Sequence, residues 1–163
     1  MFENIYSEQT KLPVGFIVFD ISGKTFCLDI DHILTIISSK ELNQSSFFFH
    51  YNTSTIHFHD EVFPLIEFNV HNKKRFSLQN ELRNIILINF KGNKIALFVD
   101  KIVDYVSVTK STINEMKFHP AKEKSYLCGL IHYNDKKYLL LNLDQIIEEM
   151  VKQKIVFESS RRN

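Results

Sequence analysis

Three neighbouring residues, His57, His59 and Asp60, have side chains that could bind a metal ion. Side chains two positions apart on a strand point to the same face, so a strand here would place both imidazoles side by side. A catalytic zinc ion needs three protein ligands and an open position, and here Asp60 follows the second histidine directly. The sequence therefore predicts no metal centre. A metal-binding or metal-dependent protein that uses His57 and His59 is kept as an alternative.

The other candidates for chemistry are isolated residues. Cys128 lies in an apolar stretch, whereas a reactive thiol needs an electropositive and partly exposed setting, so we expect it to be structural. No glycine-rich motif for phosphate binding is present. The basic run Lys73-Lys74-Arg75 has no interleaved aromatic residues that could stack on bases. We therefore expect no catalytic residues, no cofactor and no nucleic-acid partner, and a protein that is not an enzyme.

Length and composition are those of one globular domain. The chain has 163 residues, 44% of them hydrophobic, and its 20 basic and 19 acidic residues leave a net charge of +1. This balance gives no basic field that would draw the chain to nucleic acid or to an anionic membrane. No apolar run approaches the length of a membrane span, and the first residues do not resemble a signal peptide. We expect a cytoplasmic protein with no insertion into the membrane.

The elements that must position these residues are predicted to be β-hairpins. The 15 phenylalanines and six tyrosines favour strands, because aromatic side chains pack well on a pleated surface. Hairpins are predicted around the turns Ser22-Gly23, Gly92-Asn93 and Asn134-Asp135. Pro64 interrupts the strand predicted at Glu61–Phe68 and cannot donate a ladder hydrogen bond. That strand is therefore expected at a sheet edge or at a bulge.

One helix is predicted near the end of the chain, over Asp144–Lys154. Its evidence is an apolar stripe at i, i+3, i+4, i+7 and i+8, formed by Leu143, Ile146, Ile147, Met150 and Val151. Asp144 is the predicted N-cap, because its carboxylate can accept a hydrogen bond from the first turn.

The order of these segments resembles the CheW-like domain family, the adaptor domain of bacterial chemotaxis arrays. The Val62–Phe68 segment is similar to the family's "vvPvxDL" strand, and Ile95–Val106 to its "xgLvVDxVxdV" signature. The other matching segments are Phe16–Phe19, the Gly23 turn, Phe26–Ile33, Leu127–Leu130 and Leu139–Asp144. Each piece alone is common, and the ordered set covers nearly the whole chain.

The resemblance implies an all-β fold of two five-stranded, SH3-like β-barrel subdomains with a C-terminal α-helix. It predicts a single CheW-like domain at residues 14–154, with an N-terminal extension at 1–13 and a tail at 155–163. It also implies a non-enzymatic adaptor that couples chemoreceptors to a chemotaxis histidine kinase. The kinase's regulatory domain would bind at Val99, Ile102 and Val106. The cytoplasmic tip of a methyl-accepting receptor would be the second partner, which places the chain at membrane-associated receptor arrays.

The sequence departs from the family at the "NLRG" turn, which here reads His57-Phe58-His59-Asp60. His59 stands at the arginine position, Asp60 at the glycine position, and Thr35 where a glutamate normally pairs with that arginine. The resemblance implies a receptor-binding groove lined by Ile33, Ile36, Phe58 and His59. Because a histidine is mostly uncharged at pH 7, this groove would prefer a less acidic receptor. A CheW-like paralogue that serves a non-flagellar pathway is the other alternative.

Overall fold

The computed structural model describes residues 12–41, 47–50, 55–67, 83–109, 112–115 and 126–151. Strands make up most of these residues. The chain divides into two compact units, a larger one of Val14–Ser107 and a smaller one of Met1–Pro13 and Val108–Asn163.

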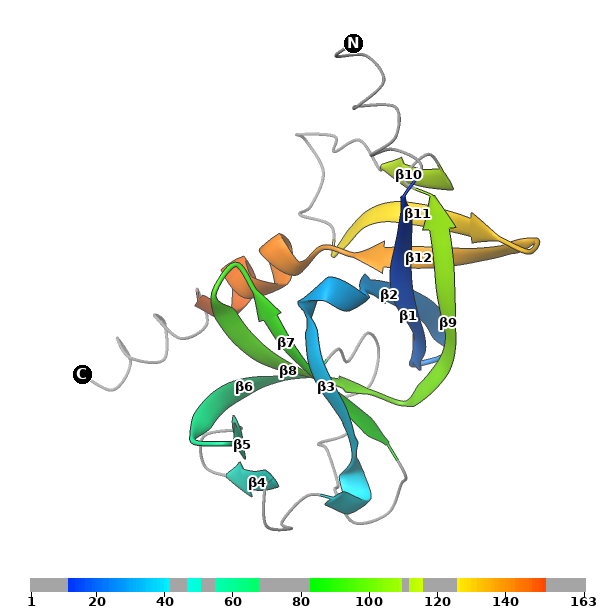
Figure 1. Cartoon of the computed structure of the whole chain (residues 1–163). Helices are drawn as coiled ribbons and strands as arrows, with labels where there is room; N and C mark the ends of the chain where they lie inside the picture. Colours follow the sequence, from blue (N-terminus) through cyan, green and yellow to red (C-terminus); the bar gives the residue numbers. More distant parts are fainter. Residues whose placement is uncertain are drawn as a thin grey trace. The chain divides into compact units, whose positions relative to one another are not determined.

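The first sheet of the larger unit begins with the hairpin predicted around Ser22-Gly23. β1 (Pro13–Ile21) and β2 (Lys24–Asp29) pair antiparallel, and β9 (Lys101–Thr109) lies on the other side of β1 (Figure 1). Ser22 and Gly23 have φ angles of 50° and 81°. Two consecutive positive φ angles are typical of the tight turn whose twist matches that of the flanking strands.

The second sheet has the strand order β3-β7-β8-β6-β5-β4 (Figure 1). Two short 3₁₀ turns, η1 (Ile30–His32) and η2 (Ser39–Glu41), flank its first strand. Its strands are β3 (Ile33–Ser38), β4 (Phe47–His50), β5 (Thr55–Phe58), β6 (Glu61–Glu67), β7 (Asn84–Phe90) and β8 (Asn93–Val99). All its neighbouring strands pair antiparallel except β6 and β8, which are parallel.

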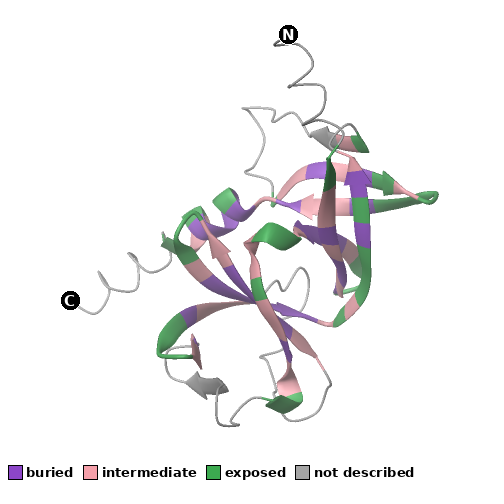
Figure 2. Cartoon of the chain, viewed as in Figure 1, coloured by how far each residue is buried: buried purple, intermediate pink, exposed green. Residues whose placement is uncertain are grey.

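Both faces of β7 and β8 are buried (Figure 2). One face contributes to a core cluster of Ile37, Ile56, Phe63, Ile85, Leu87, Ala96 and Phe98. The other carries Ile86, Ile88, Ile95, Leu97 and Val99, all 0% exposed. This explains why the sequence reads as continuous apolar runs here, where a half-buried strand would alternate.

The expectation for Pro64 is wrong, because β6 lies between β5 and β8 and the pairing of β5 with β6 shows no bulge. Pro64 lies opposite Thr55 of β5, whereas the parallel register with β8 begins one residue later, at Leu65 and Ala96. The proline therefore precedes the ladder with β8, where its missing N–H group would have cost a hydrogen bond.

The smaller unit contains β10 (Ile113–Glu115), β11 (Leu127–Tyr133), β12 (Lys136–Leu141) and a helix at residues 143–151. The helix is where the apolar stripe predicts it, and the predicted end at Lys154 lies outside the described residues. Its N-cap is Asn142, whose Oδ1 accepts a hydrogen bond from Gln145 N at 3.2 Å. The assignment of Asp144 as the N-cap is therefore wrong, because the helix starts at residue 143 and Asp144 lies within its first turn.

Candidate protein-binding site

The turn between β5 and β6 presents an aromatic pair. β5 ends at Phe58, and His59 and Asp60 form the turn with φ angles of 46° and 62°. Phe58 is half-buried and packs against the core cluster, whereas His59 is exposed. The two ring centroids are 4.1 Å apart. Because Phe58 is fixed by the core, it supports the imidazole of His59 at the surface.

The two histidines of this segment are not arranged as a metal site. Residue 59 lies in the turn, so strand alternation does not place it beside His57, and the expectation that both share a strand face is wrong. The Nε2 atom of His57 lies 3.3 Å from Thr55 Oγ1. Among the residues that the structure describes, no group of three or more histidine, cysteine or acidic side chains could bind a metal ion together.

Ile33 and Ile36 lie on the face of the sheet opposite to Phe58. They are three residues apart, and an irregularity in register between Ile33 and Thr35 lets both pair with residues on one face of β7, namely Ile88 and Ile86. That face is turned away from the core cluster against which Phe58 packs. The four residues of the predicted groove therefore do not share one face of the sheet.

Val62 is a surface residue that the sequence interpretation missed. It is 47% exposed and lies directly opposite His57 in the β5–β6 pair. The signal was present in the alternation of β6, where the buried Phe63 lies on the opposite face.

A second candidate surface follows the corner from β8 into β9. Of the predicted kinase-binding residues, Val99 and Val106 are buried, at 0% and 1% exposure, and Ile102 is half-buried. Val103 and Tyr105 of β9 are 42% and 53% exposed. Strand alternation puts Val103 and Tyr105 on one face of β9, and Ile102 on the opposite face with the buried Val106. A partner on the exposed face of β9 would therefore meet Val103 and Tyr105.

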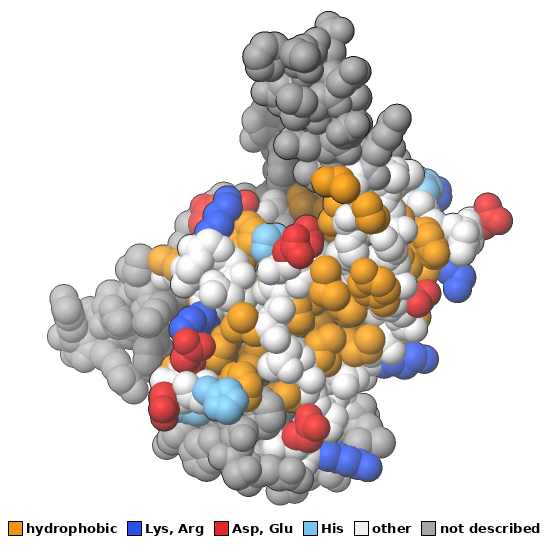
Figure 3. All heavy atoms as spheres, viewed as in Figure 1, with side chains coloured by type: hydrophobic (Ala, Val, Ile, Leu, Met, Phe, Trp, Pro, Cys, Tyr) orange, Lys and Arg blue, Asp and Glu red, His pale blue; other side chains and the backbone are white. Residues whose placement is uncertain are grey.

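Tyr105 lies across β1. A Cβ atom added to Gly15 would be 2.5 Å from the hydroxyl oxygen of Tyr105, so the absent side chain at Gly15 makes room for this ring. Figure 3 shows hydrophobic side chains gathered over β1 and β9 on the face in view. This apolar region is suited to contact with another protein.

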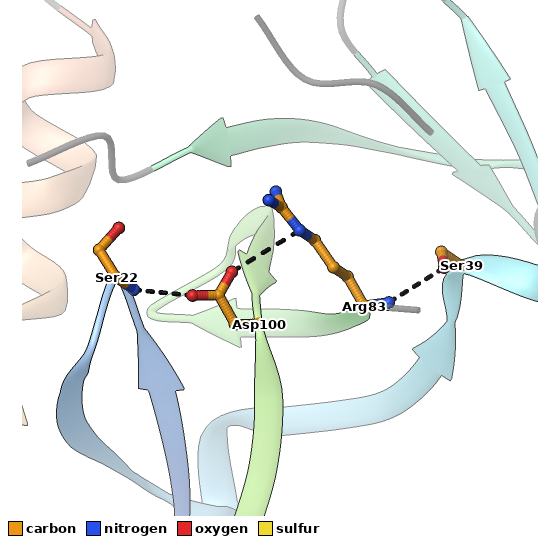
Figure 4. Close-up of polar contacts among 4 residues, drawn as sticks. All are labelled: Ser22, Ser39, Arg83 and Asp100. Carbon is orange, nitrogen blue, oxygen red and sulfur yellow. Dashed lines mark hydrogen bonds and ion pairs between the residues drawn. The ribbon is translucent and has the colours of Figure 1, made fainter. Parts of the chain in front are cut away.

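The Asp100 carboxylate braces the corner between β8 and β9. Its Oδ2 accepts a hydrogen bond from Ser22 N at 2.7 Å, and its Oδ1 lies 3.7 Å from Arg83 Nε (Figure 4). Asp100 N donates to Asp20 O at 2.9 Å. Arg83 N in turn donates to Ser39 Oγ at 3.2 Å. The Asp100 carboxylate therefore connects the β1–β2 turn to the start of β7.

Comparison with known proteins decides the family. The model of the CheW-like domain family matches residues 15–151. The chain belongs to the CheW-like domain family. Members of this family are non-enzymatic scaffold and adaptor proteins of chemotaxis. No curated protein sequence matches the chain.

The fold has a solved counterpart. The chain is similar to the scaffolding protein TtCheW from Thermoanaerobacter tengcongensis, with a TM-score of 0.62 and 18% sequence identity. The match covers 81% of this chain and 90% of that one. It confirms the predicted fold class, which is a CheW-like all-β fold with a C-terminal helix. The predicted strand count is wrong for the sheet β3-β7-β8-β6-β5-β4, which has six strands where five were expected. None of the helices in the described ranges has both the length and the hydropathy of a membrane span.

Proposed function

We propose that this CheW-like chain couples chemoreceptors to a chemotaxis histidine kinase. It would act in the cytoplasm, at membrane-associated receptor arrays, as one functional domain of residues 14–154. The observation that carries the proposal is the family match over residues 15–151. A scaffold needs surfaces for its partners and no reacting groups, which agrees with exposed apolar residues on two different sheets of the larger unit.

The receptor tip is proposed to bind at the β5–β6 turn, through Phe58 and His59. Phe58 supplies an apolar ring fixed by the core, and His59 supplies an exposed group that can form a hydrogen bond without carrying a permanent charge. Ile33 and Ile36 lie on the opposite face of the sheet and are proposed as a separate part of the receptor contact.

The kinase's regulatory domain is proposed to bind along β9. Ile102 is the most accessible of the three residues implied by the family signature. Val103 and Tyr105 present an exposed apolar surface on the other face of β9. Val99 and Val106, both buried, would contribute by holding β8 and β9 in place.

Titration calorimetry of the full chain would test the proposal. The partners are a receptor-tip fragment and the regulatory domain of the chemotaxis kinase, both from the organism that encodes the chain. We expect separate binding of each partner and a ternary complex when both are present. Failure to bind either partner would overturn the proposed function. Binding of the kinase domain alone would mean that this chain keeps the kinase contact and has lost the receptor contact.

A further inference from the structure

The β5–β6 turn has a conformation that its own residues disfavour. Both His59 and Asp60 have positive φ angles, and neither is glycine. Each such residue is strained, although histidine and aspartate tolerate this region better than most residues do. A strained conformation persists only where the surrounding structure determines it. Contacts with the neighbouring strands must therefore keep this turn in its conformation.

Among the described residues, the start of β6 is paired with β5 and not with β8. Residues 61–64 of β6 pair with β5, while the parallel register with β8 begins at Leu65. In the part of the chain that the structure describes, residues 61–64 therefore have no backbone register with β8. Phe58 packs against the core and fixes the residue that precedes the turn. The residue that follows the turn is Glu61, which lies opposite Phe58 in the β5–β6 register. Its side chain provides a second anchor, on the side of β8.

That anchor is an ion pair with β8. Lys94 Nζ lies 2.5 Å from Glu61 Oε1, and the two side chains are 34% and 45% exposed. Lys94 is itself fixed by the antiparallel register with β7, where it lies opposite Asn89. The pair thus connects the first residue after the turn to a central strand of the sheet.

We propose that Glu61 and Lys94 are positioning residues for receptor recognition, because their ion pair fixes the turn that presents Phe58 and His59. This inference rests on the proposed function, since it assumes that the turn meets the receptor. It adds two residues that need not touch the receptor themselves. An exposed pair contributes little to global stability, so its effect should appear in the turn conformation and not in the melting temperature.

The first test examines the turn in the free protein. Backbone NMR of Lys94→Met and Glu61→Gln is expected to change the amide shifts and the HN–Hα couplings of residues 59 and 60. Lys136→Met, which removes an exposed lysine from β12, is the matched control and should leave both residues unchanged. Unchanged shifts and couplings at residues 59 and 60 in both pair variants would overturn the inference, whether or not a receptor binds.

The second test measures affinity. Each single variant is expected to weaken binding of the receptor-tip fragment about two- to fivefold, with binding of the kinase domain unchanged. The charge-swapped double variant, Glu61→Lys with Lys94→Glu, should recover most of the loss if the attraction within the pair is what matters. No recovery would mean that the two charges contact the receptor directly, which would overturn the positioning role. If the wild-type chain binds no receptor, the proposed function fails, and the NMR result still decides whether the pair fixes the turn.

Discussion

Asp60 occupies a backbone conformation that favours glycine, with a φ angle of 62°. We predict that glycine gives a more stable protein than alanine at this position, which is the reverse of their order at an ordinary strand position. Asp60→Gly should be more stable than Asp60→Ala by about 1 kcal/mol, because a left-handed conformation penalises a Cβ atom. Urea unfolding of the two variants measures the difference.

The same pair of substitutions at an ordinary strand position is the control. At the exposed Lys137 of β12, the alanine variant should be the more stable of the two. If alanine is also preferred at position 60, the turn does not have the conformation described. The family's glycine at this position thus has a physical reason, and this chain meets the same demand with an aspartate.

His59 is the residue through which we expect receptor preference to be expressed. His59→Arg adds a permanent cation to the exposed side of the turn and should weaken binding to the chain's own receptor about two- to fivefold. Acidic receptor tips should gain affinity in the same experiment. Titration calorimetry at two salt concentrations would check this, because an effect of charge decreases with added salt.

Phe58→Ala is the companion variant, since it removes the ring that supports His59. If neither variant changes affinity while the wild-type chain binds, the turn is not the receptor site. The departure from the family sequence at the turn would then have no role in receptor preference.

At the scale of elements, Asp100 connects the corner between β8 and β9 to the turn between β1 and β2. Asp100→Ala should lower the free energy of unfolding by about 1 kcal/mol, because Ser22 N loses its acceptor. Asp100→Asn should cost less, since an amide oxygen can still accept that hydrogen bond and the contact with Arg83 is partly exposed. Equal losses for the two variants would show that charge, and not the hydrogen bond, is what matters. Chemical denaturation measures both.

β8 illustrates how burial sets the cost of a substitution. Leu97 is 0% exposed and lies between Ile86 and Ile66 of the neighbouring strands. Leu97→Ala should therefore lower stability by about 2–5 kcal/mol, through lost apolar burial and the cavity left behind. Leu97→Met keeps the volume and should cost less than about 1.5 kcal/mol. A change near zero for the alanine variant would contradict the register of the sheet.

At the scale of the whole molecule, an adaptor with two separate binding surfaces can lose its affinity for one partner and keep its affinity for the other. Val103→Asp places a charge on the exposed part of β9 and should weaken binding of the kinase domain about tenfold or more. Its stability should change by less than about 0.5 kcal/mol, because the side chain is already partly in solvent. Binding of the receptor tip should be unchanged. Titration calorimetry with each partner separately measures the two affinities, and urea unfolding measures the stability. Asn134→Asp, which also adds one negative charge at an exposed position, is the control.

Equal weakening of both partners by Val103→Asp would argue against two separate surfaces. If Val103→Asp binds the kinase domain as tightly as the wild-type chain does, β9 is not part of the kinase-binding surface.

The parts of the fold that depend on local chemistry could be predicted from the sequence. The turn Ser22-Gly23 needs positive φ angles and has them. Runs such as Ile85–Ile88 predict a strand, because apolar β-branched residues suit a pleated and buried surface. The helix at residues 143–151 follows from a stripe at its own period. In each case, residues within about ten positions of one another carry the information.

Which of these residues contact one another depends on the long-range pairing of the strands. The register irregularity next to Ile33 places Ile33 and Ile36 on the face opposite to Phe58, which strand alternation could not reveal. The acceptor for Ser22 N is supplied 78 residues further along the chain, by Asp100. Val99 and Val103 are both valines, yet one is buried and the other exposed, because an apolar side chain suits a core and a partner-binding surface equally well. The difference lies in which strand pairs beside them, and that depends on the long-range register of the sheets.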